Sequence, residues 1–583
     1  MSEKNHVLSG LLTEMATIYR YLGPEERFRA LAYAKAARTL DRLSKEVTHY
    51  IRNGTLEDIP GIGESIADKV IEFATTGHIH KLEELKREVP YELLELMSVS
   101  GFGPQSLKQI HEVLHIDTRD ELISALEDGR ISRLKGFGTK KVDNMKRGLK
   151  LHKQSEERIL LWQAIQIGDR IKGQLENLKE VKQIEVAGSV RRGRETIGDL
   201  DILVSCRPAD RRKIVQAFTL LPDRKIQLSK GDTRASIIIH DHHRQVDLRL
   251  VSPHEWGSAL LYFTGSKEHN VALRTQAKEK GLKINEYGVY RTKDNVRLAG
   301  STEEEIYAQL GLQYIPPEMR EMTGELELAA AHQIPQLINV NDLHGDMQMH
   351  STWSDGQMEI EPLAHYVLRH FDYEYIVLTD HSKSSRIAGG KDAKAFERQM
   401  REIDQINKKL GKSFIKKGVE VDILPDGTLD LPDALLEKMD WVCASIHSGF
   451  SHDNTERLLA ACRNPYVNGL GHPSGRLIGK REAYKVDWTK LFKVAKQTGT
   501  SMEINAQPDR MDLSDQLARQ AREAGVTLTI STDSHAADQF SNISLGVINA
   551  RRAWCQAKDI LNTRSWKEVE KFIKHKRDKR KLD

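Results

Sequence analysis

The sequence predicts a multidomain protein with an α-helical N-terminal region, a central α+β domain and a C-terminal α/β domain. A glycine-centred motif occurs three times before residue 150, which predicts short helices joined by tight loops. An apolar run with two aspartates lies near residue 200, and short apolar strands that end in histidine or acid alternate with helical stretches after residue 341. With 583 residues, the chain is long enough for about four domains.

The composition is typical of a soluble globular protein, with 39% hydrophobic and 30% charged residues. The four cysteines form no CxxC pair, which favours a reducing compartment over a disulfide framework or a cysteine zinc site. No apolar run approaches the ~18 residues of a membrane span, and the N-terminus has no hydrophobic secretory core. We therefore expect a cytoplasmic protein that does not enter membranes.

The net charge of +4 is too small to indicate nucleic-acid binding by itself. Positive charge is concentrated instead in the C-terminal segment 571–583, KFIKHKRDKRKLD. We expect this segment to be a solvated, partly disordered end, although it could add nonspecific phosphate affinity.

Helical spacing of apolar residues predicts helices over residues 6–50, followed by three similar hairpins at 59–73, 98–113 and 134–149. Each hairpin has an apolar residue, then GxG, then a helix that begins with polar residues. They look like helix-hairpin-helix motifs, in which loop glycines let a DNA phosphate approach backbone N–H groups at a helix N-terminus. This contact does not read sequence. The glycines expected to contact DNA are Gly61, Gly63, Gly101 and Gly103.

The central stretch from Ala187 to Val204 places two carboxylates on one face of a strand. Asp199 and Asp201 are two apart in an apolar run, so their side chains point the same way. Such a pair repels unless a cation such as Mg²⁺ or Mn²⁺ lies between its members. With Asp247 from a second strand pattern, three carboxylates can hold two ions for a phosphoryl transfer.

Any single one of these acids would more simply be a solvated residue at a strand end. The preceding run GSVRRG argues against that reading. Its glycine-serine turn exposes backbone N–H groups, and its arginines can hold a triphosphate. The pattern therefore favours a nucleotide site.

The run GSVRRGRETIGDLDILV at 188–204 resembles the nucleotidyltransferase signature of family X DNA polymerases, the repair polymerases related to polymerase beta. The resemblance continues through VDLRLV at 246–251, LLYFTGSKEHNVALR at 260–274 and KINEYGVY at 283–290. It implies a palm domain followed by a nucleotide-selecting subdomain, acting on gapped or primer-template DNA and dNTPs.

The resemblance also implies individual roles. Asp199, Asp201 and Asp247 would hold two Mg²⁺ or Mn²⁺ ions, with Asp247 nearest the primer 3′-hydroxyl. The expected nucleotide-binding residues are Gly188, Ser189, Arg192 and Gly198 around the triphosphate, Tyr262, Phe263 and Gly265 beside the sugar, and Asn270 and Arg274 towards the incoming nucleotide and the template. One departure is Lys267, where polymerase beta has an acidic residue; a cation there should alter contact with the incoming base or phosphate.

Some family members have an N-terminal lyase-type domain in which a lysine forms a Schiff base with an abasic sugar. Lys69, in the helix after the first hairpin, falls at the similar position, and Lys35 resembles a lysine that contacts the 5′-phosphate at a gap. Both could instead be ordinary surface lysines, because nucleophilic use requires a depressed pKa. Lyase activity is therefore only a hypothesis.

The sequence changes character after Tyr314. Residues 316–340 contain a Pro-Pro pair and no long periodic segment, which predicts a linker or docking arm. Beyond it, five strand patterns end in histidine or acid and alternate with helices, which suggests parallel β/α units with an active site at the strand C-terminal ends. A lone histidine at such a place is usually structural, but a set of mixed imidazole and carboxylate groups suits zinc, manganese or iron.

The ordered set resembles the polymerase and histidinol phosphatase (PHP) domain, a distorted (β/α)7 barrel that binds up to three metals and cleaves phosphoesters. Bacterial family X polymerases often carry this domain C-terminally as a manganese-stimulated 3′–5′ exonuclease. The positions that match its ligand pattern are His350, Asp355, His381, Glu420, His447, His472, Asp533 and His535, with His381 and Asp533 also expected to be catalytic.

The ninth ligand position differs from the PHP pattern. The family opens with His-x-His, whereas this chain reads Gln348-Met349-His350. Since a neutral amide oxygen is a poor substitute for imidazole on a transition metal, we expect one metal position to be weakened. Nuclease activity would then be reduced, altered or more dependent on manganese.

The sequence thus predicts a gap-filling family X DNA polymerase of base-excision-type repair with an attached 3′–5′ exonuclease, acting as a monomer. Three alternatives stay open: a phosphoesterase whose N-terminal half only targets it to DNA, a polymerase whose PHP domain is only a scaffold, and template-independent nucleotide addition. The predicted domains are a lyase-type helical domain (1–88), a second helical subdomain (89–152), the palm (153–250), the nucleotide-selecting subdomain (251–315), the linker (316–340), the PHP domain (341–575) and a basic tail (576–583).

Overall fold

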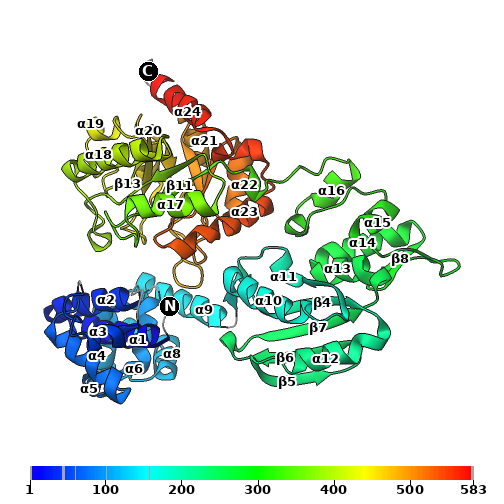
Figure 1. Ribbon diagram of the computed structural model, residues 1–583, viewed down its shortest axis with the longest axis horizontal. Coiled ribbons are helices and arrows are strands. Elements are labelled where there is room, and N and C mark those ends of the chain that lie inside the picture. Colours follow the sequence, from blue (N-terminus) through cyan, green and yellow to red (C-terminus); the bar gives the residue numbers. More distant parts are fainter. Residues whose placement is uncertain (1–2, 42–45, 60, 100, 157, 580–583) are drawn as a thin grey trace. The chain divides into compact units, whose positions relative to one another are not determined.

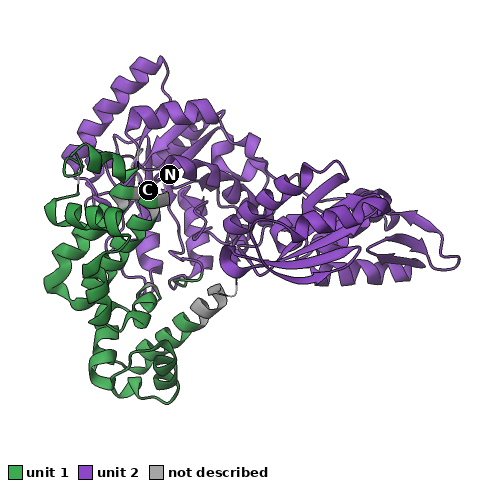
Figure 2. Ribbon diagram, turned by 60° about the horizontal axis from the view of Figure 1, so that its bottom comes forward, with its two compact units in different colours: residues 1–155, 479–482 green, residues 156–478, 483–583 purple. Residues whose placement is uncertain are grey.

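A computed structural model describes residues 3–41, 46–59, 61–99, 101–156 and 158–579. The chain divides into two units, residues 1–155 with 479–482 and residues 156–478 with 483–583 (Figure 2). None of the helices in the described ranges is long and apolar enough to cross a membrane.

The first 155 residues are helical wherever they form regular structure in the described part. The helices are α1 (Glu3–Leu22), α2 (Arg27–Asp41), α3 (Val47–Arg52), α4 (Glu64–Thr76), α5 (His80–Arg87), α6 (Tyr91–Leu94), α7 (Pro104–Leu114), α8 (Arg119–Glu127) and α9 (Thr139–Glu156). One cluster of buried hydrophobic residues, which includes Leu12, Leu82 and Phe102, contains residues from every one of these helices. The two predicted helical subdomains therefore share a core.

The three glycine hairpins have the same backbone geometry. The first glycine of each, Gly61, Gly101 and Gly136, has a positive φ of 95°, 98° and 86°, a conformation that favours glycine. The second glycine caps the next helix, as Gly63 does for α4 and Gly103 for α7. The internal repeat is thus present in the structure, and each loop leads directly into the N–H groups that open a helix.

The central domain is built on a mixed five-stranded sheet. Its elements are β1 (Ile159–Leu160), α10 (Leu161–Glu176), β2 (Val181–Val186), α11 (Gly188–Arg191), β3 (Thr196–Ile197), β4 (Leu200–Cys206), α12 (Arg211–Thr219), β5 (Arg224–Lys230), β6 (Arg234–Ile239) and β7 (Gln245–Val251). The strand order is β2-β4-β7-β6-β5, with α10 and α12 packed on the sheet (Figure 1). Only β4 and β7 are parallel, and they lie side by side at the centre.

A smaller α+β subdomain follows. Its elements are α13 (Trp256–Thr264), α14 (Lys267–Glu279), the antiparallel strands β8 (Leu282–Asn285), β9 (Gly288–Arg291) and β10 (Arg297–Ala299), and α15 (Glu303–Gln309). The segment predicted as a linker or docking arm packs back onto it and forms the short helix α16 (Glu325–Ala330). Arg320 and Glu325 have no exposed surface, and Glu325 accepts a hydrogen bond from the His269 ring at 2.8 Å. This segment is therefore a docked arm.

The C-terminal domain is a ring of seven parallel strands that follow one another in chain order (Figure 1). They are β11 (Gly345–Met349), β12 (Tyr375–Leu378), β13 (Ile415–Asp422), β14 (Trp441–Ser445), β15 (Gly469–Leu470), β16 (Ser501–Asn505) and β17 (Leu528–Ser531). A parallel bridge between Met349 and Ser534 joins the first strand to the end of the last. The predicted seven-stranded barrel is confirmed.

Helices connect the barrel strands, as parallel pairing requires. They are α17 (Ile360–His370), α18 (Ala393–Leu410), α19 (Asp433–Leu436), α20 (Thr455–Arg463), α21 (Trp488–Thr498) and α22 (Asp515–Ala524), and α23 (Ile543–Arg552) follows the last strand. Because the strands are parallel, their C-terminal ends open at one end of the barrel. The histidines and acids found in the sequence stand at that end.

The chain continues as α24 (Trp566–Lys579), so the prediction of a partly disordered end over residues 571–583 is wrong for residues 571–579. Lys576 is only 1% exposed, and its ammonium donates to the carbonyl of Cys462 and the hydroxyl of Thr500. The helix forms because Trp566, Val569 and Ile573 bury one apolar face in a cluster that includes barrel residues. Residues 580–583 lie outside the described residues.

Candidate active sites

The three aspartates of the central domain gather on neighbouring parallel strands. Asp201 on β4 is directly opposite Asp247 on β7, and Asp199 stands just before β4. Burial, together with the charges of Asp199 and Asp247, raises the pKa of Asp201 to about 7. Asp247 accepts hydrogen bonds from Ser236 and, at 3.0 Å, from Gln245. Three carboxylates in this arrangement suit divalent cations, which would relieve their repulsion.

The glycine-serine turn lies against this carboxylate cluster. Gly188 has a φ of 62°, and a Cβ on it would stand 2.5 Å from Asp201 Oδ2. The backbone N–H of Ala187 donates to the carbonyl of Asp201 at 2.8 Å. Only glycine lets the loop approach the acid so closely. Ser189 is the next residue of α11, so the turn and the acids form one site.

The two arginines after this turn have different environments. Arg191 makes a two-pronged ion pair with Glu303, at 2.9 and 2.8 Å, and Glu303 also binds the buried Arg320 at 2.6 Å. Arg192 donates through Nε to Glu321 at 3.1 Å and through Nη1 to the carbonyl of Thr264. Arg191 is therefore structural, whereas Arg192 keeps N–H groups for a ligand.

The ion pairs of Glu303 shift its protonation. Burial alone would raise the pKa of Glu303, but the charges and hydrogen bonds of Arg320 and Arg191 outweigh it and lower the pKa to about 2. Glu303 stands at the start of α15 and so joins that helix to the triphosphate turn and to the docked arm. Sequence patterns gave no sign of the pair with Arg191, because Arg191 and Glu303 lie 112 residues apart.

The other predicted nucleotide-binding residues surround the end of α13 and the start of α14. A small pocket is lined by Tyr262, Asn270 and Arg274, and the Asn270 amide donates to the Tyr262 carbonyl at 2.7 Å. Phe263 packs edge-on against the Tyr262 ring, with centroids 5.2 Å apart.

Two predicted glycines border these side chains. A Cβ on Gly265 would stand 3.1 Å from Arg192 Nη1. The glycine predicted to border the sugar therefore lies beside the arginine predicted to bind the triphosphate. Gly198 directly precedes Asp199, and a Cβ on it would meet Arg158 at 3.3 Å. The structure thus brings the predicted nucleotide residues to one region.

The barrel gathers all eight predicted ligands at the strand ends. Three groups have ligand atoms within 4.8 Å of one another: His350, Asp355, His381 and His535; His381, Glu420 and His447; and His350, Glu420 and Asp533. Glu420 is common to two groups, with Oε2 3.1 Å from His381 Nδ1 and Oε1 2.9 Å from His472 Nε2. This arrangement suits a carboxylate that bridges metal ions.

The electrostatics of this cluster fit metal binding. Burial opposes ionisation, but His381 and His447 outweigh it and hold the pKa of Glu420 well below its usual range. Burial lowers the pKa of His381 to about 4, so that its ring is neutral as a ligand must be. Burial also opposes a charge on His350 and His447, but the neighbouring acids outweigh it and raise the pKa of these rings to about 9 and about 10, so a metal ion has to displace their protons. Asp355 Oδ1 and His381 Nδ1 are buried and make no hydrogen bond of good geometry, although His535 Nε2 and Glu420 Oε2 lie 3.3 and 3.1 Å from them.

Gln348 occupies the position of the missing first histidine. It is 1% exposed, its amide nitrogen donates to Asp533 Oδ1 at 3.4 Å, and its oxygen accepts from the Cys443 thiol at 3.0 Å. The side chain therefore turns an N–H group, not a lone pair, towards the group formed by His350, Glu420 and Asp533. Its orientation supports the prediction that this metal position is weakened.

Four residues around the nuclease site were missed by the sequence analysis. Asp422 holds His447 Nδ1, which fixes that ring with Nε2 towards Glu420. Asp380 accepts from the hydroxyls of Ser351 and Ser354 and so shapes the loop after β11. Asn505 donates to Asp533 Oδ2 at 3.0 Å, and Arg510 lies 3.9 Å from it. A signal existed for Asp422, two residues beyond Glu420 on the same strand face.

The predicted DNA-contacting lysines lie in the helical unit. Lys35 lies against Gly61, since a Cβ on that glycine would be 3.1 Å from the lysine Cε. Two residues that were separately predicted to contact DNA are therefore neighbours. Lys69 is half-buried, and its ammonium donates to the carbonyl of Ser65 at 2.8 Å. The roles of both lysines stay predictions.

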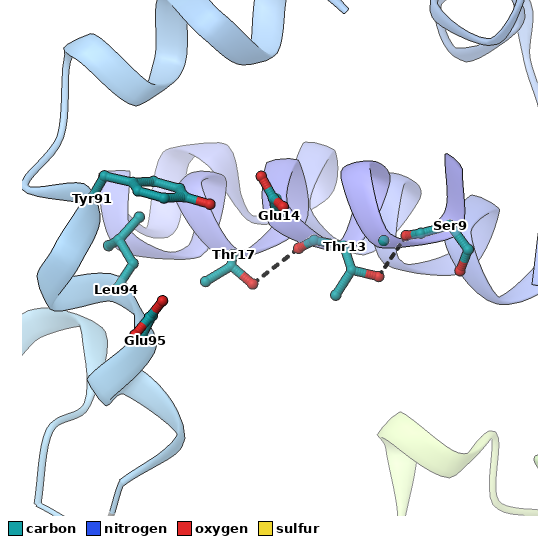
Figure 3. Close-up of a pocket in the computed structure, with 8 residues that line it drawn as sticks. Ser9, Thr13, Glu14, Thr17, Tyr91, Leu94 and Glu95 are labelled. Carbon is teal, nitrogen blue, oxygen red and sulfur yellow. Dashed lines mark hydrogen bonds between the residues drawn. The ribbon is translucent and has the colours of Figure 1, made fainter. Parts of the chain in front are cut away.

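A surface pocket of about 370 Å³ also lies in the helical unit, between α1 and α6 (Figure 3). The hydroxyls of Thr13 and Thr17 in its wall donate to the carbonyls one turn earlier, both at 2.9 Å. Glu14 in the same wall pairs with Lys86 at 2.9 Å. Its lining includes none of the residues predicted to bind DNA or nucleotide, so we assign it no chemistry.

Comparisons with known proteins identify the family. Four domain models match: a helix-hairpin-helix domain at residues 3–79, a SAM-like helix-hairpin-helix tandem at 93–151, the DNA polymerase beta palm at 162–251 and the DNA polymerase beta thumb at 259–321. The chain is 36% identical over 568 residues to the DNA polymerase/3'-5' exonuclease PolX of Bacillus subtilis (strain 168), covering 97% of this chain and 98% of that protein. The chain belongs to the family X DNA polymerases.

Two further relatives match parts of this polymerase. DNA polymerase lambda of Rattus norvegicus is 28% identical over 337 residues, which cover 53% of this chain and 55% of that protein. A protein named Probable phosphatase, from Thermoanaerobacter sp. (strain X514), is 30% identical over 178 residues, which cover 28% of this chain and 70% of that protein.

These matches confirm the predicted fold class and the predicted DNA polymerase with its attached PHP nuclease domain. The enzyme depends on divalent metal ions and acts on DNA with nucleotides as substrates. The alternative in which the N-terminal half only targets a phosphoesterase to DNA is set aside, because that half carries the polymerase palm and thumb.

Protons should compete with metal at the palm aspartates, because the pKa of Asp201 is raised to about 7 without a cation. Below about pH 7, the Mg²⁺ concentration for half-maximal primer extension should rise roughly tenfold per pH unit, as one proton is displaced. Extension at fixed pH and varied Mg²⁺ measures this. An Mg²⁺ requirement that is constant between about pH 6 and 8 would contradict the assignment.

Glu303→Gln should destabilise the palm–thumb contact, because it leaves Arg191 and Arg320 without their carboxylate. Breaking such a buried pair costs about 3–5 kcal/mol of unfolding free energy. Since the pKa of Glu303 is lowered, its stabilisation is present above about pH 4.5 and is lost as pH falls towards 2. Urea unfolding at several pH values tests this, with the exposed neighbour in Glu304→Gln as the control.

Proposed function

We propose that this polymerase fills short gaps in DNA during repair by templated extension of a primer, and that its PHP domain trims 3′ ends. The observation that carries the polymerase half is the pairing of Asp201 with Asp247 on adjacent strands, with Gly188 against Asp201. The nuclease half rests on the cluster of histidines and acids at the strand ends, in which Glu420 contacts His381, His447 and His472.

In the polymerase step, the primer 3′-oxygen bonds to the α-phosphorus of a dNTP, the bond to the β-phosphate oxygen breaks, and pyrophosphate leaves. Asp199, Asp201 and Asp247 are the ligands for two Mg²⁺ or Mn²⁺ ions, which would neutralise the developing charge. Asp247 is held by Ser236 and Gln245 and would orient the 3′-hydroxyl and accept its proton as the oxygen attacks.

The remaining nucleotide contacts divide by position. Arg192 and the N–H groups of Gly188 and Ser189 would hold the triphosphate. Gly198 would leave room beside the acids, while Tyr262, Phe263 and Gly265 would border the sugar and exclude a 2′-hydroxyl. Asn270 and Arg274 share one face of α14 and would face the incoming nucleotide and the template.

The helical unit would bind the DNA backbone. Gly61, Gly63, Gly101 and Gly103 open loops in front of helix N-termini, which suit phosphates. Lys35, which lies against Gly61, would add a cation for the 5′-phosphate of a gap. A templated gap is favoured over template-independent addition because this unit gives the polymerase a second hold on duplex DNA.

In the nuclease step, water attacks the terminal phosphodiester and the 3′ nucleotide leaves. Mn²⁺, Zn²⁺ or iron held by His350, Asp355, His381, Glu420, His447, His472, Asp533 and His535, up to three ions and fewer where Gln348 weakens a position, would supply a Lewis acid. Asp422 and Asn505 would keep His447 and Asp533 oriented, and Arg510 would balance the phosphate charge. We further propose that the enzyme acts as a monomer in the cytoplasm, where DNA and dNTPs are present.

The two activities should separate by mutation, because their acids lie in different domains. On a primer in a one-nucleotide gap with Mn²⁺, Asp247→Asn should lower extension about 10³-fold or more and leave trimming intact. His381→Ala should do the reverse. Gel analysis with and without dNTPs measures both reactions. If the wild-type enzyme extends but never trims, the PHP domain is a scaffold.

Restoring the missing histidine should strengthen the nuclease. Gln348→His replaces an amide N–H directed at Asp533 by an imidazole that can bind metal. We expect the Mn²⁺ concentration for half-maximal trimming to fall about tenfold or more, in line with the loss seen when metal-site groups are removed. Gln348→Asn, which keeps an amide, is the matched control. An unchanged Mn²⁺ requirement in Gln348→His would contradict a weakened position at Gln348.

A further inference from the structure

The triphosphate loop, defined as residues 188–195, is covered by helix α23 of the PHP domain. Gly193 in this loop has a φ of 66°, and a Cβ on it would stand 2.2 Å from Ile548 Cγ2 of α23. A substituted Gly193 would therefore collide with the nuclease domain. The loop that should hold the nucleotide is shaped on its outer side by that domain.

The hydrophobic cores of the palm and the PHP domain are continuous at this contact. Leu545 on α23 and Met511, each 1% exposed, belong to the same buried cluster as Ile197 and Leu200 beside the palm acids. Ile548 packs on the edge of this cluster. A continuous core resists sliding of the two domains at this point.

Arg552 at the end of α23 reaches both the backbone and the partner of Arg192. Its side chain is 4% exposed, and its Nη1 donates to the Arg192 carbonyl at 2.6 Å and to Glu321 Oε1 at 3.1 Å. The same Glu321 oxygen accepts from Arg192 Nε at 3.1 Å. Asp515 holds the other side of the Arg552 guanidinium, at 2.9 and 2.6 Å.

Arg476 makes a second connection between the same elements. It pairs with Glu195, the last residue of the triphosphate loop, at 2.8 Å. Its guanidinium also donates to the carbonyls of Arg510 and Met511, at 2.9 and 2.5 Å. Both ends of the segment after Arg191 are therefore held by arginines of the PHP domain.

We propose that Arg552 is a positioning residue of the polymerase nucleotide site, so that the nuclease domain helps to form the triphosphate pocket. Arg552 fixes the backbone of Arg192 and holds Glu321, which in turn aims the Arg192 guanidinium. An arginine that is already ordered loses less side-chain entropy when a triphosphate binds. This inference rests on the proposed role of Arg192 in binding the triphosphate, and it gives the PHP domain a part in positioning that arginine.

The test uses the full-length enzyme on gapped DNA and measures KM and kcat for the dNTP. Arg552→Met removes the hydrogen bonds but keeps most of the apolar stem. We expect its KM for the dNTP to rise about tenfold with kcat within about twofold, because nucleotide binding and not chemistry loses support. Trimming of a 3′ end without dNTPs should stay unchanged.

The neighbouring Arg551→Ala is the matched control. Arg551 also ties α23 to the chain outside the barrel, through Glu318 at 2.6 Å and the carbonyl of Ile338 at 2.9 Å, but it contacts neither Arg192 nor Glu321. It should leave the KM for the dNTP unchanged. A similar KM rise in Arg551→Ala would mean a general loosening of α23 and would overturn the proposal.

A double-mutant cycle separates this inference from the polymerase assignment. If Arg552 acts through Arg192, then Arg552→Met should add little to the KM already raised by Arg192→Ala. Full additivity, or an unchanged KM in Arg552→Met, overturns the role of Arg552 while templated extension by the wild type still stands. If Arg552→Met does not fold, Arg552→Lys carries the test, with a KM rise of about threefold expected and no rise contradicting the proposal.

Discussion

Repulsion between buried carboxylates is the constraint around which this enzyme is organised. Asp199, Asp201 and Asp247 stand close enough that the pKa of the buried Asp201 rises to about 7. In the barrel, Glu420 and Asp533 are buried around the same histidine, His350. Such clusters persist only where a cation or a set of donors compensates them. The rest of each domain supplies that compensation and keeps the acids from moving apart.

The two domains meet this constraint in different ways. In the palm, neighbouring parallel strands fix the distance between Asp201 and Asp247, and the positive charges come from a loop whose glycine reaches the acid. In the barrel, acids and imidazoles alternate around the strand ends, and Glu420 contacts several histidines. The barrel buries Glu420 and Asp533, but it leaves the side chains of Asp355 and His535 34% and 27% exposed at its open end.

Most of the fold and of both candidate sites could be predicted from sequence because their signals are local. The spacing of Asp199 and Asp201, the repeated GxG hairpins and the strand-end histidines each lie within short segments. Contacts between distant segments left no such signal, as for the ion pair of Glu303 with Arg191, 112 residues apart.

The C-terminal helix was misjudged for a different reason. Its many lysines and arginines suggested a solvated tail, whereas the apolar residues on one face of α24 pack against the barrel. The prediction gave more weight to the number of charged residues than to the helical spacing of the apolar ones, although burial of Trp566 and Ile573 determines the structure. Lys576 is a further example, because its ammonium is buried and donates hydrogen bonds to the Cys462 carbonyl and the Thr500 hydroxyl.

Extension and trimming are opposed reactions on one 3′ end, and the structure joins their sites through a short path. From Arg192 the path runs through Arg552 into α23, and from Glu195 it runs through Arg476 to the loop that carries Arg510 beside Asp533. Both connections are charged hydrogen bonds, and a donor that loses its acceptor there is costly. Because arginines of the nuclease domain hold both Arg192 and Glu195, a movement of that domain at this contact would also move the triphosphate loop.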